Sequence, residues 1–490
     1  MIDVLKDALL GFDWFILGYF LALNGGYLLL IALAVFAIAR NRRRRPFAGH
    51  DDVFANPLTP GVSVVVPAYN EELCIVESVR AMLGLRYPQL EVIVVDDGST
   101  DGTFELLRAA YDLVPVERVI PDRVPTLGAV LSVHAPRHGE PLVVVRKENT
   151  GRRSDPLNVG INTSRQPLVC IVDADSMLDE GSLLRVVKPF VDDPARVVGS
   201  GGVIRAINGS VVDRGRIEAL RMPRTWLPRI QVVEYLRSFL LGRTGWSAMD
   251  SLLIISGAFG VFRRDVLEEV GGLDLNTIGE DAELVARIHH TMRAAGRDYR
   301  VVFVAEPVCW TEVPDTLKVL ARQRRRWSRG LAEVLWKHRA MIGNPRYGRI
   351  GMLVMPYYLL FELLGPVVEL VGLAAVGTSA ALGVVNLTFA LLFAAAAFGL
   401  GLLLSVAALA IEEFSFQRYS RWRDLGAGLA AALVEHVGYR QIHAFWRLQG
   451  LISALRGGTA AWGVMPRTGF GSSEPPAPAP RLAAVDGERV

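Results

Sequence analysis

The chain has 490 residues, of which 51% are hydrophobic and 21% are charged. Its 53 Lys and Arg residues nearly balance 50 Asp and Glu residues, which excludes a chain that is basic throughout and binds nucleic acid along its length. The three cysteines, Cys74, Cys170 and Cys309, show no CxxC or zinc-ligand spacing, so a disulfide framework is excluded and buried thiols in a reducing compartment are favoured.

The first element is an uncharged run at residues 14–39 (WFILGYFLALNGGYLLLIALAVFAIA). Its length of about 26 residues is enough to cross the ~30 Å hydrocarbon core of a bilayer. A signal peptide, the alternative, would have a shorter apolar region that follows basic residues. Here the basic cluster NRRRR at 41–45 comes after the run, so the positive-inside rule places the N-terminus outside and the following residues in the cytoplasm. We therefore predict a membrane anchor over residues 1–45.

Residues 46–345 have the composition of a globular α/β domain. Four β-branched runs each predict a buried strand that ends in a loop: VSVVVPAYNEE (62–72), LEVIVVDDGSTDGT (90–103), PLVVVRKENTG (141–151) and LVCIVDADSML (168–178). Helical spacing follows the first two runs, which indicates a mostly parallel, Rossmann-like sheet. Ligands of such sheets bind at the carboxyl ends of the strands, which is where the acids of these runs fall.

The segment PRIQVVEYLRSFLLG at 228–242 has apolar side chains at helical spacing, with Glu234 and Arg237 elsewhere. Two interpretations remain open for it. It could be a core helix of the α/β domain, or a helix that lies in the membrane interface.

The membrane pattern returns over residues 346–460. Long apolar runs cover 351–377, interrupted by Glu362 and Glu369, and 380–411. Residues 425–453 are mainly apolar but contain ionisable groups, so they predict either a further span packed in a bundle or a partly interfacial helix. The Pro- and Ala-rich tail at 461–490 is predicted to be disordered.

Carboxylates follow two of the predicted strands. Asp96 and Asp97 end one strand, and the DAD motif with Asp173 and Asp175 ends another. Because side chains alternate along an extended chain, both carboxylates of DAD lie on one side, which suits Mg²⁺ or Mn²⁺ beside a diphosphate. The alternative for so short a motif is a solvated turn.

Two further stretches, SGAFG at 256–260 and IGED at 278–281, suggest an acceptor site. Small residues allow a substrate to pass close to the backbone. Asp281 is placed to act as a general base that takes a proton from a hydroxyl group. The alternative is that Glu280 and Asp281 only stabilise the amino terminus of a helix through its dipole.

The stretch RQRRRWSRG at 322–330 contains five arginines, a glutamine and a tryptophan. A polybasic patch for anionic lipid headgroups would explain the charge. It would not explain Gln323, or Trp327 directly after Arg326. Arginine forms two-pronged contacts with phosphate, and an indole offers a flat face to a sugar ring, so the stretch predicts a site for a diphosphate and a sugar.

The motifs VVVPAYNEE, VVDDGSTD, DAD, GED and QRRRW, in this order, resemble those of family 2 glycosyltransferases. With the membrane helices, they resemble the group of cellulose, hyaluronan and poly-N-acetylglucosamine synthases. The resemblance covers residues 60–345. It implies a GT-A fold, namely an α/β, Rossmann-like domain with a mostly parallel sheet, together with α-helical transmembrane segments.

The resemblance also implies residue roles. Asp281 would be the catalytic base, with Asp173 and Asp175 as ligands of Mg²⁺ or Mn²⁺. The implied donor-binding residues are Pro67, Tyr69, Glu71, Asp97, Arg153, Asp173, Gln323 and Arg326, and the implied acceptor-binding residues are Gly257, Glu280 and Trp327. One departure concerns the donor loop, which reads GRRSDPLN at 151–158, with Arg153 where relatives often have lysine.

The predicted function is that of a hexosyltransferase in the plasma (inner) membrane with a cytoplasmic catalytic domain. It would transfer a sugar with inversion from a nucleotide-sugar, expected to be a UDP-sugar, to a growing β-linked polysaccharide. One alternative is a single transfer that makes a glycolipid, and another is a non-enzymatic membrane scaffold. Membrane lipids are expected partners, a regulatory or export partner is open, and nucleic acid is not expected because both arginine clusters flank membrane segments.

Overall fold

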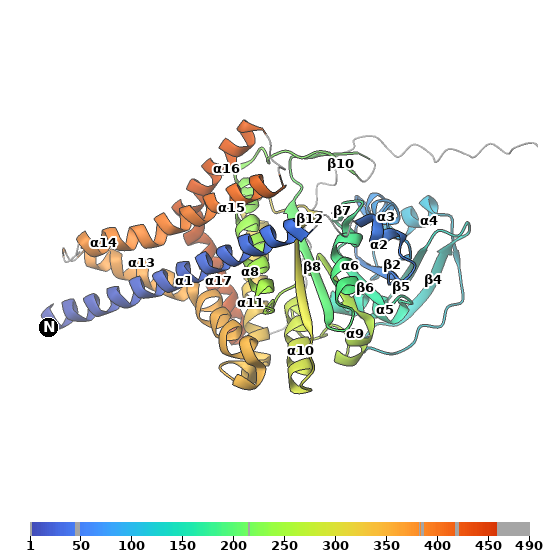
Figure 1. Cartoon of the computed structure of the whole chain (residues 1–490), viewed down its shortest axis with the longest axis horizontal. Helices are drawn as coiled ribbons and strands as arrows, with labels where there is room; N and C mark the ends of the chain where they lie inside the picture. The colour runs from blue at the N-terminus through green and yellow to red at the C-terminus, as the bar shows by residue number, and fades with distance from the viewer. Residues whose placement is uncertain are drawn as a thin grey trace, which may run out of the picture.

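The computed structural model describes residues 2–44, 50–213, 216–381, 383, 387–416 and 421–457. Arg45 of the basic cluster and the tail at 461–490, which the sequence predicts to be disordered, lie outside these residues. Figure 1 shows a sheet with its covering helices at one end of the molecule and a group of long helices, which includes α1 (Ile2–Arg44), at the other.

One 10-stranded sheet forms the centre of the α/β part, in the order β3-β4-β5-β2-β1-β6-β11-β8-β12-β7. Its strands are β1 (Val62–Ala68), β2 (Leu90–Asp96), β3 (Leu113–Pro115), β4 (Val130–Pro136), β5 (Leu142–Lys147), β6 (Leu168–Val172), β7 (Ser176–Leu178), β8 (Val197–Ala206), β11 (Phe259–Arg263) and β12 (Arg300–Thr311). The neighbours β5, β2, β1 and β6 are parallel, as are β8 and β12, whereas β11 is antiparallel to both β6 and β8. The four predicted strands are therefore confirmed, within a mixed and mostly parallel sheet. A separate pair joins β9 (Val211–Asp213) and β10 (Arg216–Ala219).

Helices cover both faces of this sheet because its strands are apolar on both sides. In β1, Val64 and Val66 belong to one buried apolar cluster, and Val65 belongs to another. The helices and short helical turns of this part are α2 (His50–Ala55), α3 (Ile75–Leu83), α4 (Thr103–Ala110), α5 (Ser154–Thr163), α6 (Ser182–Asp192), α7 (Trp226–Tyr235), η2 (Leu236–Gly242), α8 (Arg243–Ala248), α9 (Arg264–Val270), α10 (Glu280–Ala294), α11 (Leu317–Lys337), η3 (Arg339–Met341) and η4 (Pro345–Tyr347).

Two helical segments are long and apolar enough to cross a membrane, Trp14–Asn41 and Ala390–Phe416. A third candidate is a pair of segments, Ile350–Leu363 and Gly365–Ala381, that meet at 41°. The predicted run at 351–377 is thus bent, and the predicted run at 380–411 is divided, because one helix ends at Ala381 and the candidate span begins at Ala390. The helical elements here are η5 (Ile350–Val354), α12 (Met355–Tyr357), η6 (Tyr358–Leu363), α13 (Gly365–Ala381), α14 (Leu387–Ala394), η7 (Ala395–Gly399) and α15 (Leu400–Phe416).

The structure shows where two segments lie that the sequence left open. Residues 228–242 form α7 and η2, with Leu240 and Leu241 both 0% exposed, and they pack against β8 of the sheet and against α1, α15 and α16 (Trp422–Val434). The segment is thus buried where the α/β part meets the apolar helices. Residues 425–453 are not one continuous span, because the helix is broken at Val437 and Gly438. The break lies within η8 (Glu435–Tyr439), between α16 and α17 (Arg440–Arg456), and α17 packs along α11.

Candidate functional site

A cavity of about 790 Å³ opens at the carboxyl ends of β1, β2 and β6 and continues between the helices of the membrane part. It is lined by every residue that the sequence assigned to the site: Pro67, Tyr69, Glu71, Asp97, Arg153, Asp173, Asp175, Gly257, Glu280, Asp281, Gln323, Arg326 and Trp327. The structure therefore brings together motifs that are up to 260 residues apart in the chain. The individual roles of these residues remain predictions.

The loop after β1 is held in place by the loop after β2. Asn70 adopts a left-handed backbone conformation (φ 56), which asparagine tolerates better than most residues. Its Oδ1 accepts a hydrogen bond from the backbone N–H of Thr100 at 2.8 Å. The backbone N–H of Glu71 donates to Thr103 Oγ1 at 2.9 Å. These bonds fix the edge of the cavity that contains Tyr69 and Glu71.

A buried lysine links an acid that follows β2 to an acid in the first turn of α5. Lys147, which is 0% exposed at the end of β5, lies 2.6 Å from Asp97 Oδ1 and 2.9 Å from Asp155 Oδ2. Asp155 accepts further hydrogen bonds, which lower its pKa although burial opposes this. Burial raises the pKa of Asp97 to about 6, against the opposing effect of Lys147. Sequence reasoning missed Lys147, although a lysine inside a run of valines and beside acids was a usable signal.

Arg153 connects the DAD motif to the GED motif. It precedes the first turn of α5, where its Nε donates to Asp173 Oδ1 at 3.1 Å and its Nη1 donates to Glu280 Oε1 at 2.7 Å. Nη2 donates to Asp173 and, at 2.9 Å, to the carbonyl of Gly257. Burial raises the pKa of Glu280, and Arg153 opposes this rise. The planar fork of arginine thus makes contacts that a lysine could not make together.

Asp173 and Asp175 fit a divalent cation only together with a ligand. Within the residues that the structure describes, no group of three His, Cys, Asp or Glu side chains is arranged to hold a metal ion. Mg²⁺ is commonly bound by one or two carboxylates, with phosphate oxygens of a substrate and water in the remaining positions. Two carboxylates at the end of buried β6, beside a cavity large enough for a nucleotide-sugar, match that arrangement.

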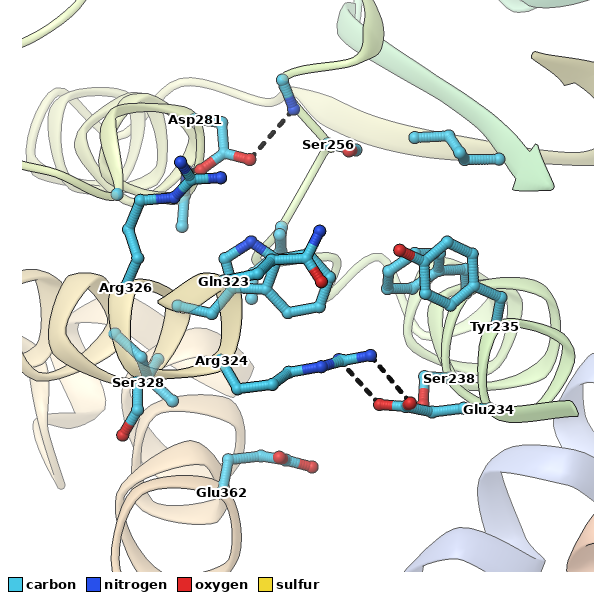
Figure 2. Close-up of a pocket in the computed structure, with 18 of the residues that line it drawn as sticks. Glu234, Tyr235, Ser238, Ser256, Asp281, Gln323, Arg324, Arg326, Ser328 and Glu362 are labelled. Carbon is cyan, nitrogen blue, oxygen red and sulfur yellow. Dashed lines mark hydrogen bonds and ion pairs between the residues drawn. The ribbon is translucent and has the colours of Figure 1, made fainter. Parts of the chain in front are cut away.

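Asp281 is anchored to the loop before β11. Its Oδ2 accepts a hydrogen bond from the backbone N–H of Gly257 at 2.9 Å, and its Oδ1 accepts one from Ala282 N–H in its own helix. Asp281 is therefore bonded within the first turn of α10 and also faces the cavity (Figure 2). A Cβ atom at Gly257 would lie 2.9 Å from Arg153 Nη1, so only glycine leaves room for these contacts.

Two glycines bring the GED motif against the QRRRW motif. A Cβ atom at Gly279, just before α10, would lie 3.1 Å from the Cα of Gly330 in α11. The backbones of the two motifs therefore touch. From α11, Arg326 points toward Asp281 and Gln323 lies nearby (Figure 2), and Trp327 also lines the cavity.

Arg324, which the sequence did not assign to the site, holds this helix in place. Its Nη1 lies 2.7 Å from Glu234 Oε1, and its guanidinium carbon lies 4.5 Å from the centre of the Trp327 ring. Tyr439 of η8 donates to Glu234 Oε2 at 3.1 Å. Both Arg324 and Arg326 line the cavity, and Figure 2 shows Arg326 beside Asp281.

The two acids that interrupt the first apolar run of the membrane part are both paired with other side chains. Tyr27 of α1 donates to Glu362 Oε1 at 2.6 Å, and Arg447 Nη2 lies 3.2 Å from Glu362 Oε2. Arg440 Nε lies 3.0 Å from Glu369 Oε1. These acids, which interrupt an apolar run in the sequence, line the inner end of the cavity and face protein, as their cost in a bilayer requires.

Comparisons with known proteins agree with this geometry. The model of a family described as glycosyltransferase like family 2 matches residues 60–330, which is more than half of the chain. The probable glycosyltransferase YdaM of Bacillus subtilis (strain 168) is 27% identical over 297 residues, or 59% of this chain and 60% of that protein. The poly-beta-1,6-N-acetyl-D-glucosamine synthase of Staphylococcus epidermidis is 26% identical over 275 residues, or 56% of this chain and 55% of that protein. The matched part is thus less than two-thirds of the length of these relatives.

A solved structure shares the fold. The mannosyltransferase PcManGT from Pyrobaculum calidifontis, in complex with GDP-Man and Mn²⁺, has a TM-score of 0.50 and 22% identity. The match covers 87% of this chain and 99% of that one. The predicted resemblance and the predicted GT-A-like α/β fold with added apolar helices are both confirmed. The chain belongs to glycosyltransferase-like family 2.

Proposed function

We propose that this enzyme transfers a sugar, with inversion, from a UDP-sugar to a growing β-linked polysaccharide at the cytoplasmic face of the membrane. The hydrogen bond between Asp281 and Gly257 carries the proposal, because it fixes a carboxylate in the cavity that also contains the DAD pair and Trp327. The names of the staphylococcal relatives, which make a β-linked polymer, support the type of product. The basic residues after the first candidate span support the cytoplasmic position of the α/β part.

In the proposed reaction, the acceptor hydroxyl oxygen bonds to the anomeric carbon of the donor. The bond from that carbon to the diphosphate oxygen breaks, and its electron pair leaves with the nucleoside diphosphate. Asp281 accepts the proton of the hydroxyl group. Arg326 binds the departing diphosphate by charge-assisted hydrogen bonds, and Trp327 offers a ring face to the terminal sugar of the acceptor.

Asp173 and Asp175 would hold Mg²⁺ or Mn²⁺, and the Mn²⁺ named with the mannosyltransferase structure supports a divalent ion. Such an ion supplies electrostatic stabilisation of the charge on the leaving diphosphate. Arg153, which contacts Asp173, would reorient toward the donor phosphate when the donor and ion bind.

A second candidate is a single transfer onto a lipid. It is favoured by the course of the cavity, which passes from Asp281 to Tyr27 and Leu30 of α1 and to Tyr357 and Tyr358 of the bent helical pair. A lipid acceptor could reach the base along this path.

The test uses membranes that contain the full chain, with Mg²⁺ or Mn²⁺ and a panel of radiolabelled UDP-sugars. Products are separated into organic-soluble lipid and high-molecular-weight polymer. We expect polymer from one donor, a loss of about 10²–10⁴-fold in rate for Asp281→Asn, and a loss on chelation with EDTA that added metal reverses. Asp192→Asn, which changes an exposed carboxylate of α6, is the matched control and should retain the rate. Label in the lipid fraction alone would establish the second candidate, and unchanged turnover in Asp281→Asn would refute the assigned base.

A further inference from the structure

The arginines that line the cavity differ in whether a carboxylate pairs with them. Most of them have an anionic partner: Arg153 has Asp173 and Glu280, Arg237 has Glu435, Arg324 has Glu234, Arg440 has Glu369 and Arg447 has Glu362. Arg243, the first residue of α8, lines the same cavity and is 9% exposed. Within the part of the chain that the structure describes, no carboxylate pairs with it, and its Nη1 has no hydrogen-bond partner.

A buried cation without a partner is costly, because its desolvation is not offset by a counter-charge. Here the guanidinium carbon lies 4.1 Å from the centre of the Phe239 ring, which compensates only part of that cost. Burial lowers the pKa of Arg243, and the charge of Asp281 opposes this only in part. A site of this kind is stabilised when a ligand brings the missing anion.

The position of Arg243 indicates which ligand could reach it. A Cβ atom at Gly245, two residues further along α8, would lie 2.4 Å from the carbonyl oxygen of Leu30, so α8 packs directly on the backbone of α1. The donor-binding acids lie at the carboxyl ends of β2 and β6 instead. Arg243 thus lines the cavity on the side of the first candidate span.

The surroundings of Arg243 suit the rest of such a ligand. The centre of the Phe239 ring lies 4.4 Å from that of Tyr235 and 6.3 Å from that of Trp327. The ring centres of Trp246 and Tyr357 lie 5.1 Å apart. Aromatic faces of this kind accept both sugar rings and apolar chains. They continue from the proposed acceptor site at Trp327 to the membrane helices.

We propose that Arg243 binds the oxyanion, of the phosphate class, of a membrane-borne anionic amphiphile that serves as the acceptor or primer of the reaction. This inference rests on the proposed function and names the class of molecule that accepts the first sugar, on which a polysaccharide then grows or a single transfer ends. In it, the guanidinium of Arg243 donates to the phosphate oxygens, the apolar chain lies against α1 and η6, and the reacting hydroxyl extends toward Asp281.

The experiment measures binding without a donor, so it does not depend on turnover. The purified full chain in dodecyl maltoside micelles is titrated with dodecyl phosphate, and thermal unfolding is followed by tryptophan fluorescence. We expect dodecyl phosphate to raise the unfolding midpoint saturably. Arg243→Gln should bind it about tenfold more weakly or worse, because one charge-assisted contact is lost, and Arg243→Lys should keep part of the affinity.

The midpoint without dodecyl phosphate separates a binding role from a structural one. Arg243→Gln should unfold at the same or a higher temperature than the natural chain, since an unpaired buried charge is removed. Arg237→Gln is the matched control: its charge is paired with Glu435, so this variant should unfold at a lower temperature and keep its response to dodecyl phosphate.

Three outcomes would overturn the inference. The first is an equal response of Arg243→Gln and the natural chain to dodecyl phosphate. The second is an equally strong response to inorganic phosphate, which would assign the site to a free oxyanion instead of an amphiphile. The third is a loss of UDP affinity in Arg243→Gln, which would assign the residue to the donor site. Failure of the proposed function would appear as absent sugar transfer and would leave this binding result unchanged.

Discussion

Arg324 and Glu234 form a buried, two-pronged ion pair, in which Nη1 lies 2.7 Å from Oε1 and Nη2 donates to Oε2 at 2.8 Å. The pair joins the helix of the QRRRW motif to α7, which the sequence left between a core and an interfacial helix. Figure 2 shows it directly beneath Gln323 and the ring that the guanidinium covers. Its position means that the side chains of α11 that we propose to bind donor and acceptor depend on Glu234, which lies outside the recognised motifs.

Removing one partner of this pair should destabilise the protein. Arg324→Met leaves Glu234 buried without a counter-ion, so the free energy of unfolding should fall by about 3–5 kcal/mol. Chemical denaturation in micelles measures it. In the double variant Arg324→Met/Glu234→Leu most of this loss should be recovered, and Arg80→Met, at an exposed pair with Glu77, should cost less than about 1 kcal/mol. An additive double variant would argue against the pair.

The affinity for the donor should fall at low pH because of Asp97. Its pKa is raised from 3.8 to about 6, so the carboxylate becomes neutral as the pH falls through about 6 and accepts hydrogen bonds from the nucleoside less well. KM for the donor, measured from about pH 5 to 7.5, should rise toward the acid end. Asp97→Asn should show a high KM without this pH dependence, and a flat KM in the natural chain would contradict the assignment.

The effect of Asp97 on folding stability should have the opposite pH dependence, because Asp97 should stabilise the folded state at low pH. Because the pKa in the folded state lies above the unfolded value of 3.8, the folded state binds the proton more tightly. The stabilising contribution of Asp97 is therefore complete below about pH 3.8 and is lost as the pH rises through about 6. Unfolding midpoints of the natural chain minus those of Asp97→Asn, taken across this range, should decrease with pH.

The contact between Gly279 and Gly330 should not tolerate a methyl group. Gly279→Ala would place a Cβ atom 3.1 Å from the Cα of Gly330, and both sides of the contact are backbone, so the two helices must separate. We expect a loss of about 1–3 kcal/mol in the free energy of unfolding and a lower kcat/KM. Gly426→Ala in α16, where no atom lies within 4 Å, is the control and should be neutral or stabilising. Equal behaviour of the two variants would show that the contact is not tight.

Arg153 should resist replacement by the lysine that related enzymes often have. Lysine keeps the charge but not the fork that reaches Asp173, Glu280 and the Gly257 carbonyl together. Arg153→Lys should raise the donor KM by about tenfold or less, whereas Arg153→Met should lower kcat/KM by about 100-fold, in line with the loss of charged hydrogen bonds. Initial rates against donor concentration test this. A fully active Arg153→Met would remove the residue from the donor site.

The parts of the fold that were predictable are those determined by local pattern. Strands β1, β2, β5 and β6 are continuous β-branched runs, and their order and acids placed the candidate residues at one sheet edge. Strand β8 escaped prediction because its sequence, VVGSGGVIRA, is rich in glycine, and β12 because it contains Glu306 and Pro307. Both are strands only because their neighbours in the sheet pair with them.

The unpredicted parts of the site are contacts between distant segments. Lys147 pairs with both Asp97 and Asp155, and only the fold brings these two acids to it. Arg324 likewise pairs with Glu234, which lies on a different helix, α7. Arg243 was not noticed because a lone arginine in a sequence carries no sign of whether it is paired. Local pattern identifies which residue types are present, and tertiary packing decides which charges are compensated.

The close packing of α17 on α11 has a consequence for how the enzyme can be divided. A Cβ atom at Gly450 would lie 2.4 Å from the carbonyl oxygen of Arg325, and Ser328 Oγ donates to the carbonyl of Arg447. The sequence suggested a domain boundary at residue 345. A fragment that ended there would expose this face of α11 to water, and Arg237 would lose Glu435, its ion-pair partner. The apolar C-terminal helices are thus part of the catalytic unit's own core, and a water-soluble, active version would require a redesigned surface instead of a truncation.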